Sequence, residues 1–484
     1  MATPIRTVLI VGGGLAAWMT AAAFARHVPG VEVTVLDDAG SGPEVVDVCA
    51  GTGPSFRHFV RGLGVNERNL VGATGGVFRL GQLFEGWQRD TAPYLHGHAP
   101  YGAPLDGIAF HQLWLRAVAG GDPVPRFDAC SYASALAGAG AFDLPDAVAD
   151  FDYGFNLDPA GCRSYLRGFA EHLGVGRIDD ALAEVRIASP ERIAQVVTRR
   201  GDVLAADLYV DCTGPAAHLL SGLEGGHAWE DWRCWLPCDR LVCFDEPAAS
   251  NPDPFDRAIA TVTGWRLVAP LRRRTLIAQL GRAAEVLAAG SGHQHLQFAQ
   301  GRRQRPWIGN CVCIGEAAVV LEPLEAAPMA VLCALISHLL ATLPDTDFAA
   351  VELAEFERRT RLAAEASRDL ISLHYQLTDR QEPFWRDAGR ASPPTRVADV
   401  LALFRERGKV PRRDGEPLLL EDWLAVLIGQ GAAGRLVGAM VDRVPADAAA
   451  QWIRHVSDTL AAAAGRAPSH RRFLERFLSQ PDGG

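Results

Sequence analysis

The first forty residues alternate between short apolar runs and an alanine-rich stretch. The run TVLIV at Thr7–Val11 is typical of a strand that is buried on both faces, and Val31–Leu36 predicts a second strand. Between them, a glycine-rich turn and an alanine-rich segment ending near Arg26 predict a helix. A strand, a helix and a strand in this order predict a βαβ unit, and therefore an α/β fold with a parallel sheet.

Apolar runs later in the chain extend this fold. Two of them, Ala206–Val210 and Val312–Glu316, predict further buried strands. The uncharged run Ala326–Pro344 approaches membrane-spanning length, but it contains a proline, a serine and a histidine and lacks aromatic belts. We therefore predict a buried helix that begins near Pro328.

The chain divides into two predicted modules. Residues 1–345 contain the predicted strands, interrupted by Gly- and Pro-rich insertions at 88–126 and 244–256, which we predict to be loops over a pocket. Residues 346–484 show apolar positions at i, i+3 and i+4 and predict a mainly helical module.

Composition narrows the class of protein. The chain has 484 residues, 48% of them hydrophobic, with a net charge of −10 and no dominant basic tract. These values exclude a mostly disordered chain and disfavour nucleic acid or an anionic membrane as partner. Its 10 cysteines form no CxxC pair, and no signal peptide precedes the first strand, so we predict reduced thiols and a cytoplasmic location.

The turn after the first strand carries a dinucleotide-binding fingerprint. Gly12 and Gly14 allow a tight turn and a close approach of the backbone to a pyrophosphate at the helix N-terminus, and Ala17 takes the third small position. Asp37 follows the second strand, 25 residues after Gly12, where a carboxylate can bind a ribose. A second GxGxxG match at 429–434 follows a helical pattern without a strand, so we predict a helix-ending turn there and a single dinucleotide site.

Several segments in this order resemble the flavin-dependent tryptophan halogenase family over nearly the whole chain. They are VLIVGGGLAAWMTAA near the start, VFRLGQLFEGW at 77–87, DLYVDCTG at 207–214, LPCDR at 236–240, GEAAVVLEPLE at 315–325, LISLHYQLTDRQEPFWRD at 370–387, LFRERGKV at 403–410 and DWLAVLIGQG at 422–431. The resemblance implies a Rossmann-like FAD module of the single-component flavin monooxygenase type and a helical second module. We expect FAD contacts from Gly12, Gly14, Leu15, Ala16, Ala17, Asp37, Val185, Gly214, Gly315, Glu316 and Met329.

The resemblance also implies a chemistry. In that family FAD, reduced by a separate flavin reductase, reacts with oxygen, and a bound halide is oxidised to hypohalous acid. The oxidant reaches a lysine beside an aromatic substrate, and a glutamate assists the substitution. We expect the same cofactor, a reductase partner and an aromatic substrate, free or attached to a carrier; a homodimer is left open.

Arginine replaces the family's lysine in this chain. The family segment FKLG reads Phe78-Arg79-Leu80-Gly81 here, and a guanidinium stays protonated and is a poor nucleophile. Arg79 could instead donate hydrogen bonds to a peroxide, a carboxylate or a carbonyl. A surface arginine paired with Glu85 is the alternative.

The family's PLESTG segment has also changed. It reads Pro323 to Pro328 as PLEAAP, which keeps Glu325 but loses two hydroxyls and one N–H. These losses predict weak halide binding. Glu325 could act as a general base, or it could stabilise the N-terminus of the following helix, and both roles can coexist.

Two further family motifs are degraded. The signature WxWxIP reads Trp265–Pro270 as WRLVAP, and the strap segment GEA, which links the flavin and substrate sites, reads Cys49-Ala50-Gly51. The changed segments are those that serve halogenation in the family or belong to the strap. The dinucleotide fingerprint, by contrast, is intact.

The remaining candidate groups predict no metal site. His96 and His98, like His293 and His295, lack a third ligand at a recognisable spacing and are predicted to be solvated loop histidines. His374, in the segment that resembles the family's LHY, is predicted to pack between the modules.

We therefore predict an FAD-dependent oxidoreductase on the halogenase scaffold, acting as a non-halogenating monooxygenase of specialised metabolism with Arg79 and Glu325 as catalytic residues. A halogenase that uses the same two residues is the second reading. A flavin-binding but catalytically silent partner protein is the third.

Overall fold

The computed structural model describes residues 3–38, 42–144, 151–283, 293–432, 434 and 439–479. Its N-terminal part is built on a six-stranded sheet in the order β19-β20-β11-β1-β2-β7, in which β20 to β7 are parallel and β19 is antiparallel. The strands are β1 Thr7–Val11, β2 Glu32–Leu36, β7 Gly176–Ile178, β11 Leu208–Asp211, β19 Trp307–Ile308 and β20 Cys311–Cys313. The parallel sheet and the α/β fold predicted from the apolar runs are confirmed.

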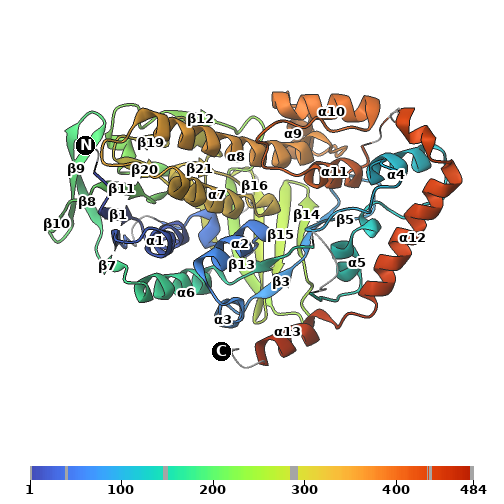
Figure 1. Ribbon diagram of the computed structural model, residues 1–484, viewed down its shortest axis with the longest axis horizontal. Coiled ribbons are helices and arrows are strands. Elements are labelled where there is room, and N and C mark those ends of the chain that lie inside the picture. The colour runs from blue at the N-terminus through green and yellow to red at the C-terminus, as the bar shows by residue number, and fades with distance from the viewer. Residues whose placement is uncertain are drawn as a thin grey trace.

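A second sheet, with parallel and antiparallel strands, lies beside the first in the centre of the molecule (Figure 1). Its seven strands, in spatial order, are β17 Gln294–Gln297, β13 Arg240–Pro247, β16 Arg274–Gly281, β15 Gly264–Pro270, β14 Asp256–Thr261, β4 Gly81–Glu85 and β5 Tyr94–Gly97. Smaller sheets pair β3 Val77–Arg79 with β6 Gly154–Asn156; β8 Leu182–Ser189 with β9 Arg192–Thr198 and β10 Val203–Leu204; and β12 Trp229–Asp231 with β18 Gly301–Arg303 and β21 Val319–Val320.

Helices cover both sheets. Those of the first half are α1 Leu15–His27, α2 Pro54–Leu63, α3 Glu67–Ala73, α4 Phe110–Ala119, α5 Tyr132–Gly138 and α6 Pro159–His172. Those of the second half are α7 Ala327–Ala341, α8 Ala350–Gln376, α9 Pro383–Arg390, α10 Thr395–Arg407, α11 Leu420–Gly429, α12 Ala446–Ala464 and α13 His470–Ser479. Figure 1 shows α7 and α8 running side by side and α12 lying beside α4 and α5.

The long apolar run forms α7, as predicted. Among the described residues, one helical segment, Leu324–Ala341, is apolar and long enough to cross a membrane, and more than half of it is buried inside the protein. Its buried side chains pack into the main hydrophobic core, which explains its uniform apolarity without a membrane.

Two sequence predictions change in detail. The insertion at 88–126 is not only loop, because it contains β5 and α4, and the insertion at 244–256 contains the end of β13 and the start of β14. The second GxGxxG match begins where α11 ends at Gly429, which confirms a helix-ending turn; Ala433 lies outside the described residues. The division at residue 345 stays a prediction.

Candidate functional site

The turn between β1 and α1 is shaped by its glycines. Gly12 has φ +139, and a Cβ there would lie 2.2 Å from the Cys212 carbonyl oxygen, so only glycine fits between β1 and β11. A Cβ at Gly13 would lie 2.5 Å from Asp37 Oδ1. The turn therefore brings its own backbone close to both neighbouring strands and to the predicted ribose carboxylate.

Several predicted cofactor residues meet at one edge of the parallel sheet. Gly214 follows β11 with φ +73, and Gly315 follows β20 with φ +71. A Cβ at Gly315 would lie 2.8 Å from the Cβ of Ala16 on α1, which places these turns side by side. The carboxyl ends of parallel strands are where doubly wound folds bind dinucleotides.

Three other predicted cofactor residues lie apart from that edge or are engaged by protein groups. Asp37 accepts a hydrogen bond from Arg177 Nε at 2.7 Å. Val185 is half-buried on β8, in a separate three-stranded sheet, and Met329 is buried in the first turn of α7. Their contacts with a cofactor stay predictions.

The N-terminus of α1 fits an anion, and a carboxylate already lies there. The N–H of Leu15 donates to Asp47 Oδ1 at 2.8 Å, and a Cβ at Gly14 would lie 2.7 Å from Asp47 Oδ2. Backbone N–H groups at such a position bind phosphate as readily as carboxylate. The glycines, the helix N-terminus and the sheet edge thus fit the pyrophosphate of FAD, provided that Asp47 gives up this N–H.

Arg79 is one of the most deeply buried side chains in the protein. It lies at the end of β3 with no exposed surface, and its Nε donates to Asp256 Oδ1 at 2.9 Å. Its Nη1 donates to the Thr52 carbonyl and lies 2.9 Å from His98 Nε2. The alternative of a surface arginine paired with Glu85 is wrong, since Glu85 pairs with Arg257.

His98 accepts from Arg79 because it is neutral. Burial lowers the pKa of His98 well below its usual value, and the positive charge of Arg79 lowers it further. Arg79 Nη2 and Asn156 Nδ2 are buried without a hydrogen-bond partner among the described residues. Asn156 Oδ1 likewise has no partner among these residues, and it lies beside Gly51, as does Arg79 Nε. The two side chains therefore keep unused hydrogen-bonding capacity in the interior.

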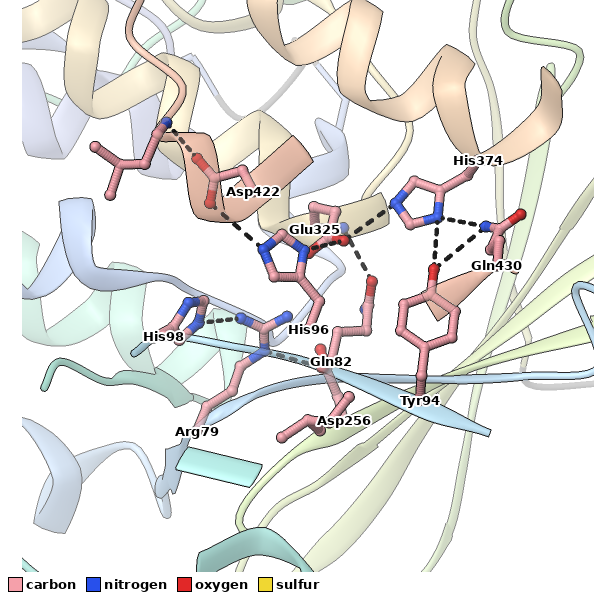
Figure 2. A network of polar contacts seen from close by, with 12 residues as sticks. Arg79, Gln82, Tyr94, His96, His98, Asp256, Glu325, His374, Asp422 and Gln430 are labelled. Atoms are coloured by element: carbon pink, nitrogen blue, oxygen red, sulfur yellow. Dashed lines mark hydrogen bonds and ion pairs between the residues drawn. The ribbon is translucent and has the colours of Figure 1, made fainter. Parts of the chain in front are cut away.

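Glu325 lies at the centre of a second buried network (Figure 2). Its Oε1 is 2.7 Å from His96 Nδ1 and 3.1 Å from His374 Nε2, and its backbone N–H donates to Gln82 Oε1. The other nitrogen of His96 lies 3.4 Å from Asp422 Oδ1 on α11. Glu325 and the next residue both have positive φ, a costly conformation that turns the carboxylate toward the histidines.

The hydrogen bonds of His374 fix its tautomer. Its Nδ1 accepts from Gln430 Nε2 at 3.0 Å and lies 3.2 Å from the Tyr94 hydroxyl. Because an amide NH₂ can only donate, Nδ1 carries no proton and Nε2–H donates to Glu325. His374 also stacks on Phe84, with ring centroids 4.4 Å apart, so its ring plane is set by packing.

These contacts hold Glu325 as a carboxylate. Burial alone would raise the pKa of Glu325, but the charge of His96 and the hydrogen bonds from His374 and His96 lower it well below its usual value. Burial lowers the pKa of His96, yet the charges and hydrogen bonds of Glu325 and Asp422 raise it to about 10. The site therefore holds a buried carboxylate–imidazolium pair.

The prediction of solvated loop histidines is wrong for His96. It is buried on β5, and its side chain points toward Glu325. His98, just after the strand, is only partly exposed. Ligand spacing does not reveal these two histidines, because their partners, Glu325 and Arg79, lie far away in the chain. The signal in the sequence is the alternation of apolar residues and histidines in YLHGH. His374 does pack between elements, as predicted, but it also binds Glu325.

The segment that resembles the family's halide site offers few donors. Ala326 donates its N–H to the Pro323 carbonyl, and Pro328, in the first turn of α7, has none to donate. A small cavity beside it is lined by apolar groups and a thiol, among them Val46, Cys49, Pro323, Ala326, Pro328 and Met329.

Comparisons with known proteins agree with this architecture. The family model described as tryptophan halogenase matches residues 7–446. The chain belongs to the tryptophan halogenase family. It is 28% identical over 488 residues to the tryptophan 6-halogenase SttH of Streptomyces toxytricini, covering 88% of this chain and 90% of that protein. It is 27% identical to the tryptophan 7-halogenase RebH of Lentzea aerocolonigenes over 83% of this chain and 81% of that protein.

Two solved structures of the family superpose on nearly the whole chain. BrvH, a flavin-dependent halogenase from Brevundimonas sp. BAL3, is 31% identical with a TM-score of 0.89, and the match covers 98% of this chain and 99% of BrvH. Xcc4156, a flavin-dependent halogenase from Xanthomonas campestris, is 30% identical with a TM-score of 0.91, covering 99% and 100%. The protein is therefore an FAD-dependent enzyme of the flavin-dependent halogenase type, whose members use FAD reduced by a separate flavin reductase.

An aromatic pocket adjoins the Glu325 network. It has a volume of about 300 Å³ and is lined by Tyr94, Tyr101, Trp114 and Phe127, with Arg126 among its polar residues. Tyr94 belongs both to this wall and to the hydrogen-bonded chain through His374 to Glu325. A pocket of this size with rigid aromatic walls suits a small aromatic ligand.

Proposed function

We propose that this protein transfers an oxygen atom, rather than a halogen, to an aromatic substrate. The observation that carries the proposal is the buried Arg79–Asp256 pair at the position of the family's lysine. A guanidinium fixed by a carboxylate, a carbonyl and His98 has no free electron pair with which to carry halogen.

The residues around Arg79 and Glu325 suit a different task. Reduced FAD, when bound, supplies the two electrons with which one atom of dioxygen enters the substrate and the other leaves as water. The ionised Glu325 can accept the proton that the substituted ring carbon or a ring hydroxyl loses. The free donors of Arg79 and Asn156 can bind a carbonyl or hydroxyl oxygen.

The environment of Ala326–Pro328 supports the loss of halide binding. An anion in this region would meet aliphatic side chains, the Cys49 thiol and the first turn of α7, from which proline removes one N–H donor. Burying an anion without compensating donors is strongly unfavourable. We further propose a cytoplasmic enzyme of specialised metabolism whose substrate is a free or carrier-attached aromatic molecule.

Halogenation is the second candidate, and Glu325 favours it. The chain keeps this carboxylate in a fully buried, ionised state, and its relatives of 30–31% identity are flavin-dependent halogenases. In that reading Arg79 would orient the oxidant by hydrogen bonds instead of carrying halogen.

One assay separates the two candidates. The protein is incubated with FAD, a flavin reductase, NADH, bromide, ¹⁸O₂ and a panel of indoles and phenols, and the products are analysed by mass spectrometry. We expect a product that has gained one ¹⁸O atom and no bromine. A bromine isotope doublet in the wild-type product contradicts the proposal, and oxygen consumption that yields only peroxide with every substrate contradicts both candidates.

The matched variant is Arg79→Lys combined with Ala326→Ser, Ala327→Thr and Pro328→Gly. It restores the amine, the hydroxyls and the N–H together. We expect bromide incorporation only in this variant. Arg79→Lys alone is the control, because it restores the lysine amine but not the groups that would bind the halide.

A further inference from the structure

A short acidic segment lies across the predicted FAD site. It is the 3-10 helix η2, Val45–Asp47, with Glu44 immediately before it. Its carboxylates point inward, since Glu44 is 4% exposed and the side chain of Asp47 is 2% exposed. We call residues 44–47 the acidic latch.

The latch binds the same groups that a dinucleotide would use. Asp47 accepts from the Leu15 N–H at the start of α1, and its other oxygen accepts from the Glu44 N–H at 3.2 Å. Glu44 Oε1 accepts from the Glu316 N–H at 3.3 Å, just after β20. Both contacted N–H groups belong to turns at the carboxyl edge of the parallel sheet, where the glycine fingerprint lies.

The glycines of the site are packed against the latch rather than against open space. A Cβ at Gly14 would lie 2.7 Å from Asp47 Oδ2, and one at Gly315 would lie 2.9 Å from Glu44 Oε2. The latch carboxylates therefore occupy the space beside these two glycines. Because glycine has no side chain, a ligand could otherwise approach the protein backbone there.

One atom of the latch is poorly matched to its surroundings. Glu44 Oε2 is buried and has no hydrogen-bond partner among the described residues. The groups that face Glu44 are the carboxyls of Glu316, Asp47 and Asp211, all acidic, and Arg163 approaches Asp47 only to 4.0 Å. Burial and this acidic company raise the pKa of Glu44 well above its usual value, and burial raises that of Glu316 to about 8. A carboxyl group that is buried among other carboxyl groups is readily displaced by a ligand that binds the same N–H groups more favourably.

We propose that the acidic latch is an internal competitor of FAD: Glu44 and Asp47 occupy the N–H donors of the pyrophosphate site, and FAD binds by displacing them. The latch makes the flavin exchangeable and lowers its affinity, which suits an enzyme that receives reduced FAD from a separate reductase. The inference does not depend on whether the product gains oxygen or halogen.

The test measures FAD affinity of the full-length protein by flavin fluorescence and calorimetry, without turnover. For Asp47→Ala we expect FAD to bind roughly tenfold or more tightly, because the competing state loses a charge-assisted hydrogen bond to Leu15. Asp47→Asn keeps an acceptor oxygen without the charge and should fall between wild type and Asp47→Ala. Glu44→Ala, which removes the acceptor of the Glu316 N–H, should also bind FAD more tightly.

A matched control is Asp207→Ala at the opposite end of β1. Asp207 accepts hydrogen bonds from the N–H groups of Arg6 and Thr7. Like Asp47 it binds backbone N–H groups, but it lies far from the glycine turn. We expect unchanged FAD affinity there. Unchanged or weaker FAD binding in Asp47→Ala and Asp47→Asn overturns the proposal, as does failure of wild type and both variants to bind FAD. Binding by the variants alone supports it.

If Asp47→Ala does not fold, hydrogen exchange of the wild-type protein gives the second readout. FAD should protect residues 12–18 and alter exchange of the latch, whereas a latch whose exchange does not respond to saturating FAD contradicts displacement.

Discussion

His96 Nδ1 lies 2.7 Å from Glu325 Oε1, and the two side chains are 7% and 8% exposed. Such a pair is stable only with further partners, and here His374 and Asp422 supply them from α8 and α11. Glu325 comes from the predicted first module, whereas these two partners come from the predicted second one. The site therefore depends on how the C-terminal helices pack.

Glu325→Gln should reduce product formation by about a hundredfold or more, since a neutral amide cannot accept the proton that the substrate loses. The measurement is the initial rate of product formation at saturating reduced FAD. FAD affinity should stay within about twofold of wild type, because within the described part of the chain Glu325 contacts His96, His374 and Gln82 and not the glycine turn. A variant that retains most of its rate would exclude Glu325 as the base.

The stability contributed by the His96–Glu325 pair should depend on pH with a defined sign. The pKa of His96 is raised from 6.5 to about 10, so its contribution is complete below about pH 6.5 and is lost as the pH rises through about 10. The pKa of Glu325 is lowered from 4.5, so its contribution is present above that pH and is lost as the pH falls toward the folded value.

The difference in unfolding free energy between wild type and His96→Gln should therefore be largest between about pH 4.5 and 6.5 and should shrink toward pH 10. Urea denaturation across this range measures it. His295→Gln, which changes an exposed histidine on β17, is the control and should show no such profile. A flat profile for His96→Gln would show that His96 is not charged in the folded protein.

Removing one partner of the buried Arg79–Asp256 pair should be strongly destabilising. Asp256→Ala leaves a buried guanidinium without its carboxylate, and such changes cost about 3–5 kcal/mol. The double variant Arg79→Met, Asp256→Leu removes both charges and should recover much of that loss. Chemical denaturation gives the comparison; a single variant as stable as wild type would mean that the pair is not buried in solution.

Gly12→Ala should destabilise the protein by a few kcal/mol and abolish FAD binding, because its Cβ would lie 2.2 Å from the Cys212 carbonyl at φ +139. Gly168→Ala on α6 is the control, since a Cβ there meets nothing within 4 Å. The control should be neutral or stabilised by up to about 1 kcal/mol. Thermal unfolding and FAD titration distinguish the two, and equal behaviour of both variants would contradict the packing argument at Gly12.

The sequence alone determined the local elements and the cofactor class. Short-range rules predict these elements: the composition of buried strands, the need for glycine at positive φ, and the signals that start a helix. In the structure, TVLIV forms β1, the segment after the glycine turn forms α1, and EVTVL forms β2. Arg79 and Glu325 came instead from the resemblance to the family's FKLG and PLESTG segments, which are contiguous in the chain.

Only the tertiary structure decided the state of these groups. Whether Arg79 is a surface cation or a buried partner of Asp256 depends on a residue 177 positions away. Whether His96 is solvated depends on Glu325, 229 positions away. Likewise, no pattern in PEVVD reveals that Asp47 reaches the N-terminus of α1. Charge, burial and donor occupancy are properties of contacts between distant segments, and such contacts exist only once the chain has folded.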